Sequence, residues 1–154
     1  MKRYVLGFMF DFGHVALIRK NRPAWQAGKF NGIGGHIEPG EEPVEAMERE
    51  FREETGVDTA GLWTACGSIK REYDFEVFIF KGICSDLRDL GLRTMTDELV
   101  VYEWISKINI GNTFIIPNLA WIIPLLLDDN SDGAPYIVHM EVAKPMKEHD
   151  LCTP

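Results

Sequence analysis

Three glutamates stand close together in the chain with a spacing that could do chemistry. Glu50, Glu53 and Glu54 occupy positions i, i+3 and i+4, so they share one face if this stretch is helical, at about 100° per residue. Like charges at this spacing repel one another, and each close pair costs about 0.2–0.5 kcal/mol on an exposed helix. Arg49 stands four residues before Glu53 and offsets part of this repulsion. A solvated acidic face with a salt bridge is the simplest interpretation of such a run.

The surroundings of these glutamates favour a second interpretation, a metal site. Val44, Met47 and Phe51 form a narrow apolar stripe beside the carboxylates, and such a stripe is expected to face the core. The glycine pair Gly34 and Gly35 precedes the stretch. A hard divalent cation needs oxygen ligands gathered at one point, and this geometry gathers them. The pattern therefore predicts magnesium as the cofactor, with manganese as the other possibility.

The same residues resemble the signature of a known family, the Nudix hydrolases. That signature runs glycine, five residues, glutamate, seven residues, Arg-Glu, an apolar residue, any residue, Glu-Glu, any residue, glycine and an apolar residue. Every specified position agrees here, and the matching residues are Gly35, Glu41, Arg49, Glu50, Phe51, Glu53, Glu54, Gly56 and Val57. The resemblance implies an α/β fold, the Nudix-type α/β/α sandwich with a mixed central sheet. It also implies a metal-dependent hydrolase of nucleoside diphosphate-linked compounds.

The resemblance assigns roles to individual residues. The implied metal ligands are the carbonyl of Gly34 and the carboxylates of Glu50, Glu53 and Glu54. Arg49 resembles the residue that orients a helix glutamate, and Glu41 resembles one that ties the preceding loop to the helix. Members of the family often add an acid from a later loop, for which Glu98 is the candidate; an ordinary loop acid is the alternative.

In-line attack of water on phosphorus needs an activated water, neutralised phosphate charge and a stabilised leaving oxygen, which divalent metals supply. One carboxylate of the site could also act as general base. Glu53 and Glu98 are the two candidates, and the sequence does not choose between them. The predicted catalytic residues are thus Arg49, Glu53, Glu54 and Glu98.

A weaker resemblance, which spans most of the chain, points to the MutT-like branch that hydrolyses oxidised purine nucleoside triphosphates. It rests on residues 30–35, on Lys20, and on Pro117 with residues 121–127. It implies that Asn31 hydrogen-bonds the purine, since an amide offers both a donor and an acceptor. A turn residue before Gly32 is the alternative for Asn31. That branch carries two aspartates after the proline, whereas this chain has Asn118 and Leu119.

Further residues complete the predicted substrate site. The set is Lys20, Trp25, Asn31, Gly35 and Asn118. Trp25 could stack on a base or be an exposed loop aromatic. His36 could contact phosphate or shape the loop, and we favour the loop. Trp104 and Trp121 are expected in the core.

The elements that must position these residues can be outlined from patterning. Strands are expected at residues 4–10, 14–18, 62–70, 73–83, 100–105 and 136–142, with a hairpin turn at 11–13 and an extended glycine-rich segment at 29–37. A helix is expected at 43–55, because Pro43 suits its first position and Gly56 its left-handed end. Residues 119–127 have helical spacing that Pro124 interrupts. Strands with two separated helices predict a mixed sheet between helices.

Length, charge and cysteine content narrow the classes of protein. The 154 residues fit one domain, residues 1–154. The formal net charge of −8 argues against binding a nucleic-acid backbone, although a bound metal could supply local positive charge for a small phosphate substrate.

Three cysteines without CxxC spacing favour free thiols in a reducing cytoplasm. The apolar run at 4–10 is short and predicts a strand, not a leader, and no stretch is long enough to span a membrane. Oligomeric state stays open.

Three functions remain in competition. The first is hydrolysis of a nucleoside triphosphate to monophosphate and pyrophosphate. The second is a Nudix hydrolase of another diphosphate, such as a nucleotide sugar or dinucleotide. The third is a nucleotide-binding module without catalysis, which the retained repulsive cluster of glutamates disfavours.

Overall fold

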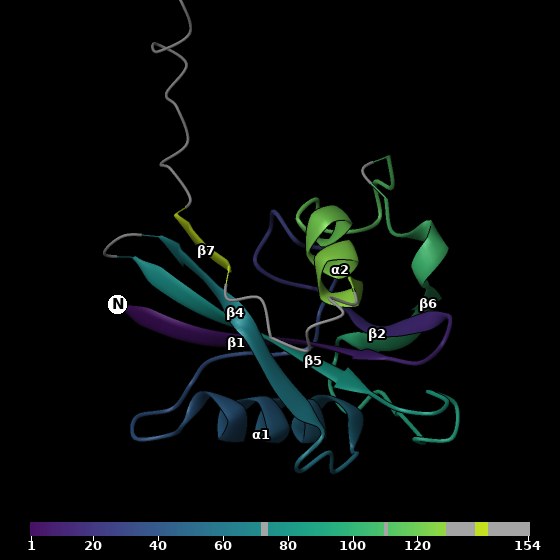
Figure 1. Cartoon of the computed structure of the whole chain (residues 1–154), viewed down its shortest axis with the longest axis horizontal. Coiled ribbons are helices and arrows are strands. Elements are labelled where there is room, and N and C mark those ends of the chain that lie inside the picture. Colours follow the sequence, from purple (N-terminus) through teal and green to yellow (C-terminus); the bar gives the residue numbers. More distant parts are fainter. Residues whose placement is uncertain (72–73, 110, 129–137, 142–154) are drawn as a thin grey trace, which may run out of the picture.

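Strand pairing between distant segments builds one mixed sheet with a helix on each face (Figure 1). The computed structural model describes residues 1–71, 74–109, 111–128 and 138–141. Its strands are β1 Lys2–Phe10, β2 His14–Arg19, β3 Phe30–Asn31, β4 Trp63–Arg71, β5 Phe75–Ile83, β6 Leu99–Trp104 and β7 Val138–Glu141. Its helices are α1 Pro43–Thr55, the 3-10 turn η1 Ile105–Lys107, and α2 Leu119–Leu127.

The sheet contains both parallel and antiparallel pairs. β1 pairs in parallel with β5 along its whole length, from Lys2 opposite Phe75 to Phe10 opposite Ile83. β4 runs antiparallel to β5 and parallel to β7. β2 runs antiparallel to β1, β3 and β6. The predicted mixed sheet and α/β/α sandwich are therefore confirmed.

Side chains that alternate along the strands fill two separate cores. In β2, Val15 and Leu17 pack in the core that includes α2, whereas Ala16 and Ile18 pack in the core that includes α1. This division follows from the period of two in a strand, where successive side chains point to opposite faces. Both faces of the sheet are covered along residues 15–18 of β2, which are all apolar and buried.

Helix α1 has the ends that its sequence predicts. Pro43 is its first residue, and the Glu42 backbone N–H donates to the Glu45 carboxylate at 3.0 Å. At the other end Gly56 adopts a φ of 74° and donates its N–H to the Arg52 carbonyl at 2.8 Å. The cap fixes where the helix stops, and therefore fixes the direction of the glutamates in its last turns.

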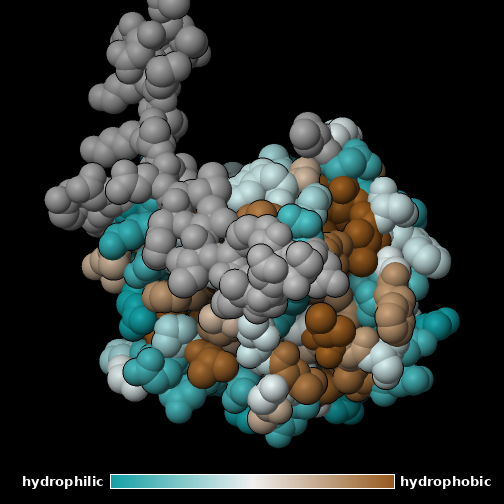
Figure 2. Space-filling view, in the orientation of Figure 1, coloured by the Kyte–Doolittle hydropathy of each residue, from teal (hydrophilic) through white to brown (hydrophobic). Residues whose placement is uncertain are grey.

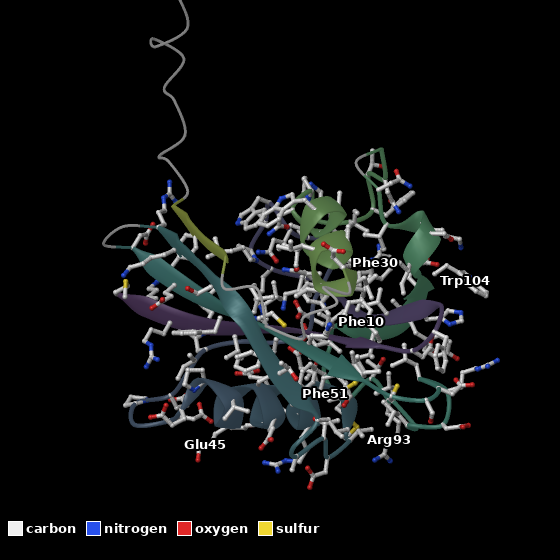
Figure 3. All side chains as sticks on the ribbon, in the orientation of Figure 1. Phe10, Phe30, Glu45, Phe51, Arg93 and Trp104 are labelled. Atoms are coloured by element: carbon white, nitrogen blue, oxygen red, sulfur yellow. The ribbon has the colours of Figure 1, made fainter. Side chains whose placement is uncertain are left out.

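Three side chains expected in the core are exposed instead. Val44 is 40% exposed in the first turn of the helix, whereas Met47 and Phe51 of the same stripe are buried. Trp104 is 52% exposed at the end of β6 (Figure 3), where it packs on the His14 ring at 4.0 Å between ring centroids. Trp121 is 39% exposed, because other apolar residues occupy the buried face of α2. These are Leu119, Ile122, Ile123 and Leu126.

Several boundaries also differ from the predicted ones. β3 has only two residues, and residues 33–37 instead run beside β1 through backbone hydrogen bonds, such as Val5 N–H to the Gly35 carbonyl at 2.9 Å. The predicted strand at 136–142 corresponds to β7, while residues 136, 137 and 142 lie outside the described residues.

No helix in the described ranges is long and apolar enough to cross a membrane. Hydrophilic residues cover much of the face in Figure 2, with hydrophobic patches between them.

Candidate metal and substrate site

Two glycines let the segment before α1 pass close to both the sheet and the helix. A Cβ on Gly34, whose φ is 154°, would lie 2.2 Å from the Val5 carbonyl oxygen. A Cβ on Gly35 would lie 2.5 Å from the carboxylate atoms of Glu50. Any side chain at these positions would separate the loop from its neighbours. The glycine pair therefore brings the backbone of the loop against the acidic face of the helix.

Arg49 joins this loop to the helix. Its guanidinium makes two bonds to Glu41, at 2.8 and 3.1 Å, and donates to the His36 carbonyl at 2.8 Å. It also donates to Glu50 at 2.9 Å. These bonds raise the pKa of Arg49 and lower the pKa of Glu41. A paired fork of this kind is both strong and directional, so Arg49 fixes one carboxylate oxygen of Glu50.

Glu54 is the least solvated carboxylate of the helix. Only 9% of the residue is exposed, and its Oε2 is buried without a hydrogen-bond partner. Burial raises its pKa to about 7; the Lys20 ammonium opposes this shift, and the carboxylates of Glu50 and Glu98 add to it. A buried acceptor without a donor costs free energy, so the position favours an added positive charge.

The other two helix glutamates differ from Glu54 and from each other. Glu50 is half-buried, and burial raises its pKa although Arg49 opposes the change. The side chain of Glu53 is 57% exposed and has only a 3.3 Å contact with Arg49. The three carboxylates predicted as equivalent ligands thus have three different environments.

Glu98 and Lys20, which the sequence suggested separately, are partners in one buried ion pair. Lys20 Nζ lies 2.5 Å from Glu98 Oε2, and Glu98 is only 6% exposed. The Asn21 backbone N–H donates to the other oxygen of Glu98 at 2.7 Å. Antiparallel pairing of β2 with β6 sets Arg19 opposite Leu99, which explains why positions 20 and 98 meet at the same end of these strands.

The residues of this cluster fit a hard divalent cation. Within the described ranges, no three Asp, Glu, His or Cys side chains are gathered closely enough to hold an ion as they stand, because Glu50 and Glu98 pair with cations and Glu53 is exposed. However, the donors are all oxygens, Glu54 has an unpartnered buried oxygen, and the Gly35 backbone lies against the Glu50 carboxylate. Oxygen donors of this type are those that magnesium and manganese prefer.

A second group of predicted residues lies around β3. The Asn31 side-chain oxygen accepts from the Gly32 backbone N–H at 2.8 Å, as its alternative role in a turn implies. Its amide nitrogen donates to Gln26 Oε1 at 3.2 Å. No sequence pattern pointed to Gln26, because a single glutamine in a polar loop carries no pattern of its own. Asn31 is half-buried, so its amide keeps a partly open edge.

The segment before α2 lies next to β3. The Phe30 N–H donates to the Phe114 carbonyl at 2.7 Å, and the Phe30 carbonyl accepts from Ile116 at 2.9 Å. Asn118 follows this segment, makes no side-chain cap to α2, and buries Oδ1 without a partner. An asparagine that leads into a helix usually accepts from a backbone N–H of its first turn, so this amide is directed elsewhere.

Two aromatic candidates take less specific positions. Trp25 is 62% exposed on the loop between β2 and β3, which is compatible with either of its predicted roles. His36 packs its ring on Tyr4, with 4.3 Å between ring centroids. This contact supports the preferred interpretation of His36 as a residue that shapes the loop.

The fold and the acidic helix define a hydrolase of the Nudix class. A model of the NUDIX domain matches residues 2–113, and the chain belongs to this family. Nudix hydrolases generally use a divalent metal.

Solved structures with the same fold include MutT from Bacillus halodurans, which is 20% identical with a TM-score of 0.58 and coverage of 90% of this chain and 87% of that chain. MutT from Methanosarcina mazei Go1 is 22% identical, with a TM-score of 0.58 and coverage of 75% and 84%, respectively. A putative Nudix hydrolase family member from Chromobacterium violaceum is 15% identical, with a TM-score of 0.61 and coverage of 86% and 83%. At these identities the likeness supports the fold alone.

Proposed function

We propose that this Nudix hydrolase converts a nucleoside triphosphate to a monophosphate and pyrophosphate, with an oxidised purine nucleotide as the substrate to test first. The observation that carries the proposal is the Glu54 carboxylate, which is buried with an unpartnered oxygen near Glu50 and Glu98. Polyphosphate brings more negative charge to this cluster. Hydrolysis of a polyphosphate at this carboxylate cluster therefore requires a cation that both the carboxylates and the phosphates can share.

We assign that cation to magnesium, or to manganese in its place. The residues that would hold it are the Gly34 carbonyl and the carboxylates of Glu50, Glu53, Glu54 and Glu98. When bound, the metal supplies neutralisation of phosphate charge and a lowered pKa for water. The chain itself contributes the placement of these oxygens. Lys20, the ion-pair partner of Glu98, would contact a phosphate oxygen.

The remaining polar residues position the reacting groups. Arg49 holds Glu50 and the loop of His36 in a fixed relation, so the helix carboxylates and the Gly35 backbone keep their places when substrate enters. A general base must accept a proton from the attacking water. Glu53 has an open side chain for this task, whereas Glu98 is neutralised by Lys20. Because both residues are also proposed ligands, replacement of each by glutamine separates the two candidates only at saturating metal, where loss of the base still removes turnover.

The nucleobase is proposed to lie against the amides near β3. Asn31 and Asn118 would hydrogen-bond its edge, and Trp25 could stack on its face. Because Asn118 and Leu119 stand where the oxidised-purine branch has two aspartates, base reading here does not depend on a titrating acid. Neutral amides keep both a donor and an acceptor throughout the ordinary pH range.

A cytoplasmic location is part of the same proposal. Cys66 and Cys84 are free thiols in the described part of the chain, which suits a reducing compartment. The proposed partner is a small nucleotide, with neither nucleic acid nor membrane, since the net charge of −8 would repel a nucleic-acid backbone.

The test is a release assay over a panel of normal and oxidised nucleoside triphosphates, with a nucleotide sugar and a dinucleotide included. Pyrophosphate as the first product, with the highest kcat/KM on a triphosphate, is the expected result. Preference for the sugar or dinucleotide would support the second function. Binding without turnover at any metal concentration would support the non-catalytic module.

A further inference from the structure

The polar contact between Gln26 and Asn31 has no role in the phosphate chemistry. We propose that Gln26 determines base specificity by positioning the Asn31 amide, so that the base is read by a pair of amides. This inference rests on the proposed function, since it assumes that Asn31 faces a nucleobase. Gln26 acts through Asn31 and is therefore a positioning residue.

Chemistry fixes which atom of each amide faces which partner. A backbone N–H can only donate, so the Asn31 atom at 2.8 Å from the Gly32 nitrogen must be its oxygen. The other end of the Asn31 amide is therefore the NH₂ group. The Gln26 atom at 3.2 Å from this NH₂ must accept, and is the carbonyl oxygen. The two bonds hold the Asn31 amide from both ends.

Holding both ends matters because the last torsion of asparagine is soft. Such sp³–sp² torsions have broad distributions, so one bond at the oxygen leaves the amide plane free to swing. The bond to Gln26 removes this freedom before a base arrives. Preorganisation of this kind reduces the entropy lost on binding.

The loop that carries Gln26 is itself tied down. The Gln26 N–H donates to the Pro23 carbonyl at 2.9 Å, and its carbonyl accepts from Lys29 at 2.9 Å. The Gly28 N–H donates to the Lys20 carbonyl at 2.8 Å, so the loop returns to the end of β2. Gln26 and Asn31 are both half-buried, which leaves their amides within reach of a ligand.

Each amide keeps hydrogen-bonding capacity after these contacts. Asn31 retains one N–H and one oxygen lone pair, and the NH₂ of Gln26 takes no part in the bond between them. A purine edge that carries both donors and acceptors could engage this pair. Neither group titrates between about pH 5 and pH 9, so the preference among bases should not change with pH.

The test measures binding of guanosine monophosphate and cytidine monophosphate by titration calorimetry, since neither contains a scissile anhydride. Wild type is compared with Gln26→Leu, which removes the acceptor, and with Gln26→Glu, which keeps an acceptor for Asn31. The expected result is a threefold to tenfold smaller purine-to-pyrimidine affinity ratio for Gln26→Leu, equivalent to roughly one hydrogen bond. Gln26→Glu should keep most of the ratio, even if its charge weakens both affinities equally.

A double substitution shows whether Gln26 works through Asn31. Gln26→Leu combined with Asn31→Ala should lower the ratio no further than Asn31→Ala alone, because coupled residues are not additive. Equal melting temperatures would show that the loop keeps its fold. An unchanged ratio in Gln26→Leu, additive losses, or equal binding of both monophosphates by wild type would each overturn the inference. Absence of pyrophosphate release, with the ratio still dependent on Gln26, would instead reject the proposed function alone.

Discussion

The candidate site has two halves that use opposite chemistry. The charged half consists of Glu50, Glu54 and Glu98, and the amide half consists of Gln26, Asn31 and Asn118. In the charged half, burial and mutual repulsion raise the pKa of Glu54 to about 7. In the amide half no side chain carries a charge, and Asn31 has polar partners at both ends of its amide.

We expect this difference to separate the rate of hydrolysis from the preference among nucleobases. A buried carboxylate cluster is unfavourable until a cation compensates it, so chemistry in the charged half should respond strongly to metal and to the loss of one carboxylate. Hydrogen bonds between neutral groups contribute only about 0.5–1.5 kcal/mol each. Changes in the amide half should therefore shift selectivity by small factors and leave turnover in place.

Removal of metal is the largest perturbation of the charged half. Excess EDTA should abolish hydrolysis, and added magnesium or manganese should restore it, because the proposed ligands are all oxygens. The measurement is pyrophosphate release before and after chelation, with circular dichroism as a control for folding. Full activity in excess chelator would show that the cluster does not work through a cation.

Glu54→Gln should reduce kcat about a hundredfold or more while the fold persists. The substitution keeps the shape of the side chain and removes the buried charge. Glu48→Gln is the matched control, since Glu48 lies on the same helix and accepts from the Gly61 N–H at 2.8 Å, a bond that an amide oxygen can also accept. A rate near wild type for Glu54→Gln would remove Glu54 from the metal site.

The metal-free protein should lose stability as the pH rises. The folded pKa of Glu54, about 7, lies above its ordinary value of 4.5. Its neutral form therefore favours the fold below about pH 4.5, and this contribution is lost as the pH rises through 7. The free energy of unfolding in urea should decrease by about 3 kcal/mol across this window, relative to Glu54→Gln, since one pKa unit corresponds to about 1.4 kcal/mol. If the free energy of unfolding changed with pH in the same way for both proteins, the raised pKa of a buried Glu54 carboxylate would be contradicted.

Asn31→Ala tests the amide half and should have the smallest effect. Loss of one neutral hydrogen bond predicts a threefold to tenfold lower kcat/KM for purine triphosphates, through KM. Weaker discrimination among bases should accompany it. Kinetics on oxidised and normal purine triphosphates and a pyrimidine triphosphate provide the measurement, with the exposed Asn109→Ala as control. An equal loss on every substrate would mean that Asn31 shapes the loop without reading the base.

These outcomes would also show how far the halves are independent. If chelation or Glu54→Gln changes the preference among bases, the two halves are coupled, and Lys20 is the connection to examine. Lys20 holds Glu98, while its carbonyl accepts from Gly28 of the loop that carries Gln26. If the preference is unchanged, rate and selectivity are set by separate residues.

Local patterns in the sequence predicted the parts of the molecule that lie within one element. Pro43, Gly56 and the i, i+3, i+4 glutamates specify the bounds of α1 and its acidic face, because helix geometry and end preferences act over a few residues. The family signature drew on these same local features.

Contacts between distant segments could not be predicted in the same way. The sequence offered Lys20 and Glu98 as separate candidates, and only the register of β2 against β6 makes them an ion pair. No pattern in the sequence pointed to Gln26, and only the structure of the loop places its side-chain oxygen against the Asn31 amide. Trp104 was assigned to the core from its type alone, yet it is exposed at a strand end.

The sequence by itself therefore determined the family and the acidic helix, because helical periodicity converts spacing directly into geometry. The tertiary structure alone decided which glutamate is buried, which acid pairs with Lys20, and which amide holds Asn31. Burial and pairing depend on strand register and on loops that return from far along the chain, and neither is encoded in the spacing of neighbouring residues.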